Sequence, residues 1–181
     1  DNYTNLGINS LSLKNYSQAE KLYLKSLGFA TDDFQIIKVQ HNLAILYYQL
    51  KQFKRAKEIQ QLVVSNLPKS NDNYYKALIN YCRYLSHEDA NFNPQPNYKN
   101  AEKHYLSIKD NWGLAATYCY LTEYYDKKNK DSSLFYAKKM HDVSVLLHSP
   151  TDELEALQNL IKHSEHPEKY FNEYLKISDS L

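Results

Sequence analysis

Apolar side chains recur along this chain at intervals of three and four residues, the spacing that gathers them on one face of an α-helix. The final stretch shows this pattern clearly, because Tyr170, Tyr174, Ile177 and Leu181 follow one another at steps of four, three and four. Similar stripes occupy most of the sequence and predict helices in pairs. The predicted pairs cover residues 3–13 and 15–27, 40–50 and 51–63, 74–85 and 96–108, 114–125 and 129–140, and 150–163 and 167–181.

The second helices of these pairs share a repeated pattern, in which an aromatic residue is followed by two polar residues, an alanine, a charged residue and an apolar run. The three clearest copies, at residues 15–27, 51–63 and 96–108, centre on Ala19, Ala56 and Ala101. In a fourth copy Leu134 takes the alanine place. Small residues let two helix backbones approach closely. The repeat therefore predicts one all-α domain of about five helix pairs, with units over residues 1–31, 32–68, 69–109, 110–148 and 149–181.

The composition limits both the fold classes and the kinds of partner that are expected. Only 3 glycines and 5 prolines stand beside 18 tyrosines, so the chain has few turn formers and little room for a β-meander. Lysine and arginine total 22 against 21 acidic residues. No basic block is long enough to follow a phosphate backbone, so nucleic acid is not an expected partner. No apolar run approaches the length of about 18 residues that a membrane span needs.

Two stretches of the sequence indicate where predicted helices end or begin. Residues 86–97, SHEDANFNPQPN, are rich in Asn, Asp and Pro and are predicted to form a loop between the helices of the third pair. A plain surface insertion is the first interpretation, and a loop that folds over a groove edge is the second. Ser149, with Pro150 directly after it and Asp152 three residues on, predicts the start of the ninth helix.

The sequence offers little chemistry for catalysis or metal binding. Three glycines cannot build a phosphate-binding loop, and helical repeats provide no sharp turn that would activate a nucleophile. His163 and His166 are three residues apart, but Pro167 places them in an exposed connection, so no metal site is expected. Cys82 and Cys119 lie in apolar stretches and are expected to be small buried side chains. We expect a domain that is not an enzyme and has no cofactor.

The second unit, HNLAILYYQLKQFKRAKEIQQLVVSNLP, resembles a tetratricopeptide repeat. Leu43 and Ala44 occupy the leucine and small-residue places of that family, and Tyr47 occupies its aromatic place. Ala56 matches the small residue of the second helix, and Pro68 matches the terminal proline. The resemblance implies a right-handed superhelical α-α solenoid of such pairs, whose first helices line a concave face that binds a protein or peptide partner.

Carried over to this chain, the family geometry implies a concave face that mixes charged and aromatic side chains. The implied binding residues are Lys38, His41, Tyr48, Gln49, Tyr81, Cys119, Glu123 and Lys127. Family members that grip a peptide carboxylate need a lysine and an asparagine where this chain has Thr4 and Ile8. The resemblance therefore does not extend to that clamp, and a small ligand stays open as an alternative occupant of the face.

About 30 residues at the end of the sequence resemble the end of the repeat region in tetratricopeptide sensor proteins of Bacteroidetes bacteria. The matching residues lie in DELEALQNLI at 152–161 and YFNEYLKISDSL at 170–181. This resemblance implies a piece of a longer signal-transduction protein, with a periplasmic sensing domain, a membrane span after Leu181 and a histidine kinase or DNA-binding output. A homodimer of the parent protein stays open. So do two other interpretations, a protein-interaction scaffold that is cytoplasmic or periplasmic, and a glycan-binding outer-membrane lipoprotein.

Overall fold

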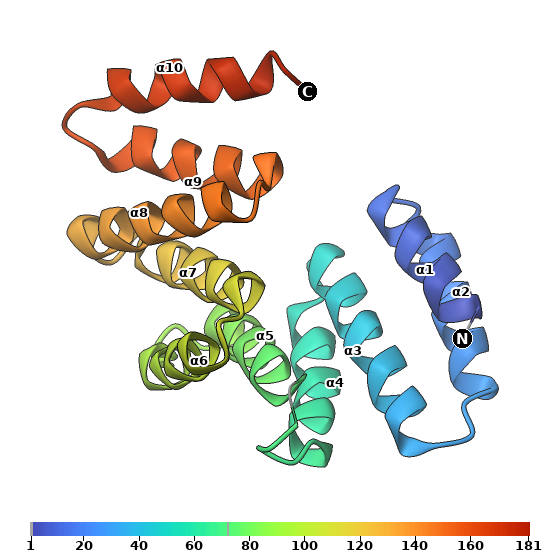
Figure 1. Ribbon diagram of the computed structural model, residues 1–181. Coiled ribbons are helices and arrows are strands. Elements are labelled where there is room, and N and C mark those ends of the chain that lie inside the picture. The colour runs from blue at the N-terminus through green and yellow to red at the C-terminus, as the bar shows by residue number, and fades with distance from the viewer. Residues whose placement is uncertain (1, 72) are drawn as a thin grey trace. The chain divides into compact units, whose positions relative to one another are not determined.

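The computed structural model describes residues 2–71 and 73–181, and over this part of the chain it contains ten α-helices and no β-strand. The predicted all-α class is confirmed (Figure 1). The first five helices are α1 (Asn2–Ser12), α2 (Tyr16–Gly28), α3 (Asp33–Gln49), α4 (Phe53–Asn66) and α5 (Asn73–Glu88). The others are α6 (Gln95–Ile108), α7 (Asn111–Tyr125), α8 (Lys130–Leu146), α9 (Pro150–His163) and α10 (Pro167–Ser178).

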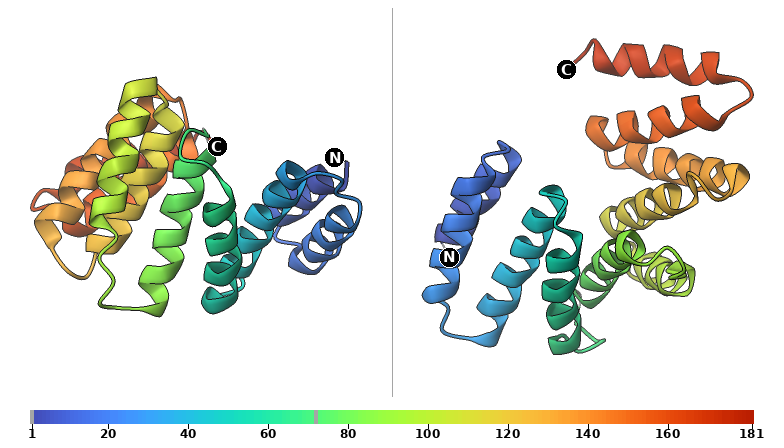
Figure 2. Two further views of the ribbon diagram at one scale, coloured as in Figure 1. Left: turned by 90° about the horizontal axis from the view of Figure 1, so that it is seen from below. Right: turned by 180° about the vertical axis from the view of Figure 1, so that it is seen from behind.

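The chain divides into two compact units, residues 1–92 and residues 93–181. Within each unit every helix packs on the next one along the chain, and α1 also contacts α3, as α7 contacts α9 (Figure 2). This consecutive packing is the arrangement of an α-solenoid built from helical repeats. None of the helices in the described residues is both long enough and apolar enough to cross a membrane.

The small residues of the repeat lie where the helices pack, as the sequence predicts. Ala19, Ala56 and Ala101 are all completely buried. In α8 Leu134 is only half-buried, whereas its neighbour Ser133 is completely buried. The predicted place of the small residue in this copy was therefore wrong by one residue. Ser133 Oγ donates to the backbone oxygen of Thr122 at 3.2 Å, which satisfies it inside the protein.

Two glycines hold a tyrosine ring directly against a helix backbone. A Cβ atom added to Gly7 of α1 would lie 2.5 Å from Cε1 of Tyr23, and one added to Gly113 of α7 would lie 2.3 Å from the ring of Tyr105. Both rings are buried. Burial raises the pKa of Tyr23 to about 12, because the phenolate would lose its hydration. A glycine is therefore needed at each of these crossings.

Four of the turns between consecutive helices, two within helix pairs and two between successive pairs, use left-handed backbone at residues other than glycine. Lys14, Lys51, Lys109 and His148 have φ values between 50° and 59°. In each turn the next residue donates its N–H to a carbonyl five residues back, as Asn15 does to Ser10 at 2.8 Å. This bond closes the end of the preceding helix. It shows how a chain with so few glycines builds tight helical hairpins.

Two element boundaries differ from the sequence prediction. Helix α3 begins at Asp33 and not near residue 40, because Asp32 caps it by accepting from the backbone N–H of Gln35 at 2.8 Å. The predicted loop over residues 86–97 is only residues 89–94, since α5 continues to Glu88 and α6 begins at Gln95. The start of α9 is as predicted, with Ser149 at the cap and Pro150 at the first helical position.

Candidate functional site

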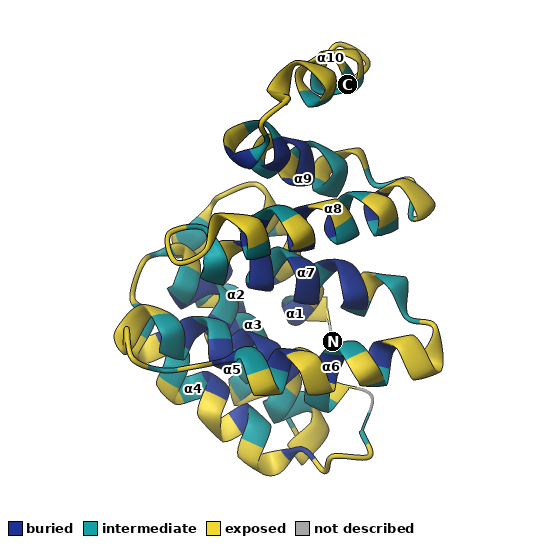
Figure 3. Cartoon of the chain, turned by 90° about the vertical axis from the view of Figure 1, so that its left-hand side faces the viewer, coloured by how far each residue is buried: buried dark blue, intermediate teal, exposed yellow. Residues whose placement is uncertain are grey.

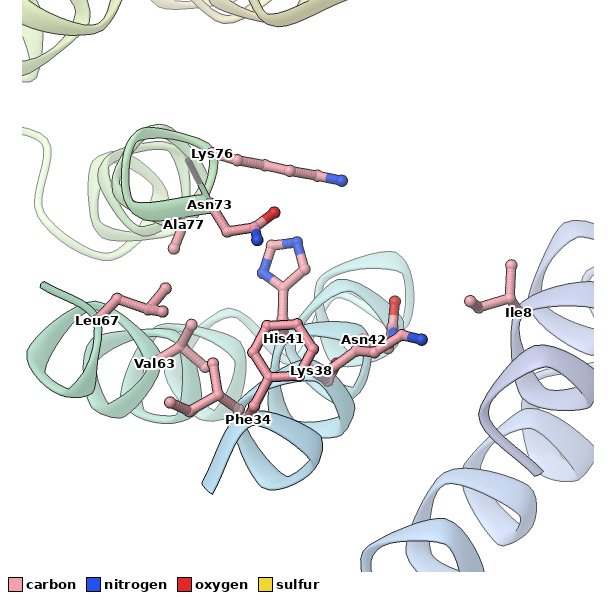
Figure 4. A pocket seen from close by; sticks show the side chains of 11 residues that line it. Ile8, Phe34, Lys38, His41, Asn42, Val63, Leu67, Asn73, Lys76 and Ala77 are labelled. Carbon is pink, nitrogen blue, oxygen red and sulfur yellow. Dashed lines mark hydrogen bonds between the residues drawn. The ribbon is translucent and has the colours of Figure 1, made fainter. Parts of the chain in front are cut away.

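A pocket of about 290 Å³ lies in the first unit, between α3, α4 and α5, with Ile8 of α1 across from it (Figure 4). Its apolar lining consists of Ile8, Phe34, Ile37, Val63, Leu67 and Ala77, and its polar lining consists of Lys38, His41, Asn42, Asn73 and Lys76. Among these lining residues there is no carboxylate. The pocket thus pairs an apolar floor with polar and cationic groups, which is the usual make-up of a ligand site.

His41 is the most deeply placed polar group of this pocket. Its imidazole points from α3 toward Asn73 and Lys76 of α5 (Figure 4). Its Nδ1 atom lies 3.1 Å from Oε1 and 3.0 Å from Nε2 of Gln60, a completely buried residue whose amide also donates to the Ala77 carbonyl at 3.0 Å. Gln60 therefore fixes the orientation of the ring.

The other ring nitrogen of His41 has no partner. Its Nε2 atom is buried and makes no hydrogen bond within the described residues, whichever tautomer the ring adopts. Burial lowers the pKa of His41 to about 4, with a further contribution from the positive charge of Lys76, while the Gln60 contact acts in the opposite direction. The ring is therefore neutral near pH 7, and Nε2 has an unused capacity for a hydrogen bond.

The charges at the pocket are positive. Lys38 on α3 and Lys76 on α5 are both exposed and both line the pocket. An ammonium group in this position attracts a carboxylate or another anion, and charge-assisted hydrogen bonds of this kind are stronger than neutral ones. The arrangement fits a ligand that is apolar at one end and anionic at the other.

Of the residues predicted for a binding face, Lys38 and His41 line this pocket and the others do not. Tyr48 lies seven residues beyond His41, which is about 10 Å along α3. Gln49 is exposed and borders a second hollow, beside Leu11 and Lys14. The pocket therefore occupies only one end of the predicted face.

Tyr48 belongs to an aromatic cluster at that other end of α3. Its ring stacks on Tyr84 with centroids 4.7 Å apart, and the guanidinium of Arg83 lies 4.5 Å from its centroid. Its hydroxyl is 2.9 Å from Nε2 of His87, whose ring stacks on Phe53 at 4.6 Å. His87 was expected in the loop of residues 86–97, and that placement was wrong because α5 extends through it and places its ring on Phe53, although the residue is exposed as a loop residue would be.

Tyr81 is half-buried on α5 and is not part of the pocket lining. Burial raises its pKa, with a smaller contribution from Cys82.

The remaining predicted residues belong to the second unit. Cys119 of α7 is half-buried, and its thiol donates to Oε1 of Glu155 at 3.2 Å, whereas Cys82 is completely buried as expected. Glu123 is exposed on α7, and Lys127 is exposed just after that helix ends. These three residues lie along one helix and its following turn.

A partly buried ionic link in the second unit was missed by the sequence analysis. His163 was expected to be exposed, but it is only 7% exposed, and its Nε2 lies 2.7 Å from Oδ1 of Asp126. Lys162 donates to both oxygens of the same carboxylate, at 2.6 and 2.8 Å. These hydrogen bonds, that of Lys162 first, lower the pKa of Asp126 although burial acts in the opposite direction. The link ties the end of α7 to the end of α9.

A second cluster in this unit also escaped the sequence analysis. The ligand-type atoms of His141, Glu153 and Glu173, one residue from each of α8, α9 and α10, all lie within 4.8 Å of one another. These positions are 12 and 20 residues apart, so they do not form a short metal-binding motif that is recognisable in the sequence. They form the one candidate metal-binding group found among the described residues.

Comparison with known proteins adds no relative to this description. Neither a model of any known protein family nor any curated protein sequence matches the chain.

Proposed function

We propose that this chain is a non-catalytic binding domain, and that the pocket of α3, α4 and α5 takes an apolar side chain of a protein or peptide partner together with a neighbouring carboxylate. The observation that carries the proposal is the make-up of the pocket. An apolar floor lies beside two exposed lysines and a neutral histidine whose buried Nε2 has no partner in the described residues. A small amphipathic acid shares this chemistry and is the second candidate ligand.

Each part of the pocket has a role in this proposal. Phe34, Val63 and Leu67 cover the apolar side chain of the partner, and the free energy gained is roughly 25 cal/mol for each Å² removed from water. Lys38 and Lys76 bind the carboxylate, with each charge-assisted hydrogen bond contributing about 1.5–3 kcal/mol. The unpaired nitrogen of His41 then gains the hydrogen bond that it lacks, either as donor or as acceptor.

The surroundings of His41 favour binding over catalysis. A catalytic histidine is normally oriented by one group and placed against a nucleophile or a reacting proton. Here Nδ1 contacts the Gln60 amide, and no serine, cysteine or carboxylate is among the described residues that line the pocket. The same pocket is therefore better suited to recognition than to acid–base chemistry.

The wider role that we propose is sensing. The helical-repeat fold suits an interaction domain, and the resemblance of the sequence to tetratricopeptide sensors supports a periplasmic domain of a membrane-anchored signal-transduction protein. In that role the partner biases the domain between two conformations, and α10 conveys the difference. A general interaction scaffold, including a cytoplasmic one, and a glycan-binding lipoprotein are the competing proposals.

Binding measurements test the pocket. Fluorescence anisotropy is measured with labelled peptides that end in an apolar residue and a free carboxylate, against the same peptides with an amidated end. We expect the carboxylate peptides to bind at least about tenfold more tightly, and the double variant K38E/K76E to remove that preference. The matched control is Lys54→Glu on the exposed side of α4, which leaves the preference intact.

Equal affinity for the two peptide forms, or an equal loss in the Lys54→Glu variant, would rule out this use of the pocket. The sensor role has a separate test in the gene that encodes the chain. A sequence beyond Leu181 without a membrane span contradicts the sensor proposal and leaves the binding proposal standing.

A further inference from the structure

Three consecutive helices of the second unit each direct one metal-binding side chain to the same place. His141 comes from α8, Glu153 from α9 and Glu173 from α10, and all three are half-buried. Nε2 of His141 lies 3.3 Å from Oε1 of Glu173, and no pair of the three ligand atoms is more than 4.8 Å apart. Side chains 32 residues apart in the sequence thus meet across the packed helices.

The electrostatic balance of this cluster is incomplete. Two carboxylates converge, yet neither has a lysine or arginine within ion-pair distance among the described residues. His141 is only 16% exposed, and its Nε2 atom is buried without a hydrogen-bond partner despite the short distance to Glu173. A buried, unpaired ring nitrogen aimed at two carboxylates indicates a missing positive group that accepts lone pairs.

We propose that His141, Glu153 and Glu173 bind a divalent transition-metal ion, with zinc as the best candidate. Two zinc ligands at about 2.1 Å and a tetrahedral angle lie about 3.4 Å apart, and the His141–Glu173 pair at 3.3 Å already has this separation. Rotation of the Glu153 side chain brings the third ligand to the same ion. Three protein ligands leave one position of the tetrahedron to water.

The ligand set selects among metal ions. Calcium and magnesium prefer shells made only of oxygen, whereas an imidazole nitrogen with carboxylates suits zinc and its neighbours in the first transition row. The ring must be neutral to donate its lone pair, so bound metal and a protonated His141 exclude each other. Zinc therefore replaces the weak contact between His141 and Glu173 with coordinate bonds.

The consequence of metal binding falls on α10. None of the residues of this helix, all of which the structure describes, is buried. Its apolar contacts are partial, and they run from Tyr170, Tyr174 and Ile177 to a core formed by Ala137, Leu157 and Leu160. An ion held by Glu173 together with His141 and Glu153 joins α10 to α8 and α9. Metal binding therefore stabilises the packing of α10 on these two helices.

The test uses the untagged chain with bound metal removed by a chelator. Zinc binding is followed by isothermal titration calorimetry, and protection of α10 is followed by amide hydrogen exchange with mass spectrometry. We expect one zinc per chain, slower exchange in α10 than in the metal-free protein, and no such effect from calcium or magnesium. The variants Glu173→Gln and His141→Ala are each expected to weaken zinc binding at least about tenfold.

Matched controls come from the exposed pair at the start of α10. His166 and Glu168 lie 3.5 Å apart and are 83% and 71% exposed, so His166→Ala and Glu168→Gln should leave both measurements unchanged. Glu173 lies at the edge of the cluster. The Glu173→Gln variant therefore still tests zinc binding if the His141→Ala variant does not fold correctly. Unaltered zinc affinity in Glu173→Gln, loss of binding in His166→Ala, or zinc binding without slower exchange in α10 would each overturn the proposal.

Discussion

The hairpin of α1 and α2 and the hairpin of α9 and α10 have the same plan but are held together differently. Helix α2 buries Ala19, Tyr23 and Ser26 almost completely, whereas α10 buries none of its described residues. In Figure 3 the visible faces of α10 are exposed or half-buried. Both helices carry an apolar stripe at helical spacing, so the stripe alone does not determine how deeply a helix is buried.

The difference comes from the residue that faces the large side chains. Gly7 lets the Tyr23 ring lie against the backbone of α1, and the Thr4 and Ser26 hydroxyls complete this contact at 2.7 Å. The rings of α10 remain partly exposed, and the hydroxyl of Tyr174 accepts a hydrogen bond from Nε2 of Gln158 at 3.3 Å. A small residue opposite a large ring gives close packing, and without one a helix relies on partial contacts and polar links.

The largest expected effect tests the close packing of the first hairpin. Gly7→Ala places a methyl group where Tyr23 ring atoms lie within 2.7 Å. Because Tyr23 is completely buried, the ring has no room to move aside, and we expect the free energy of unfolding to fall by about 2–3 kcal/mol. Chemical denaturation measures this change.

The matched control is Gly28→Ala at the end of α2, where an added Cβ meets nothing within 4 Å. Here the change should be neutral or slightly stabilising, because alanine is favoured over glycine in a helix by roughly 0.5–1 kcal/mol. Similar stability changes in the two variants would show that the contact between Gly7 and Tyr23 is not what distinguishes this hairpin.

Two buried histidines extend the comparison to pH. His41 in the first unit has an amide partner and a pKa lowered to about 4, whereas His163 in the second unit contacts the carboxylate of Asp126. Unfolded histidine has a pKa of about 6.5. Between about pH 6.5 and pH 4 the unfolded chain therefore binds a proton at His41 that the folded chain does not, so stability falls as the pH falls.

Between pH 7 and pH 5 this linkage at His41 amounts to about 2 kcal/mol of lost stability. The variant His41→Gln, which has no titrating ring, should show a correspondingly flatter dependence of unfolding free energy on pH. His166→Gln, at an 83% exposed position, is the control and should keep the wild-type dependence. If His41→Gln and the wild type lose the same stability over this range, His41 is not buried in its neutral form.

Much of the helical architecture was predictable because it depends on local spacing. The completely buried Ala19, Ala56 and Ala101 mark helix crossings, and their pattern is visible in the sequence. The early start of α3 also had a signal, since Asp32 and Gln35 have the spacing of a capping box, and the Gln35 amide does donate to Oδ2 of Asp32 at 2.7 Å.

The candidate sites were less predictable because they depend on contacts between distant side chains. The family resemblance directed attention to Lys38 and His41, which line the pocket. It gave no indication of Gln60, whose buried amide orients the His41 ring from α4. The proposed metal site had even less signal, because only the packing of three helices brings His141 and Glu173 within 3.3 Å.

The smallest expected effect concerns the ionic link that joins α7 to α9. The Asp126 carboxylate accepts hydrogen bonds from Lys162 and His163, which lower its pKa. A carboxylate with a lowered pKa contributes stability above its unfolded pKa of about 3.9, and this contribution is lost as the pH falls through the folded value. Asp126→Asn should therefore cost about 1 kcal/mol at pH 7, since Lys162 is largely exposed and its bonds are weakened by solvent.

The same substitution should also remove part of the loss of stability that the wild type shows in acid below about pH 4. Asp142→Asn, at an exposed position on α8, is the control and should change neither quantity. Denaturant titrations at pH 7 and pH 3 give both numbers, and hydrogen exchange in α9 shows whether the change is local. If Asp126→Asn kept full stability at pH 7, close packing alone would be enough to hold α9, as it is for α2, and the contrast between the two hairpins would then be confined to α10.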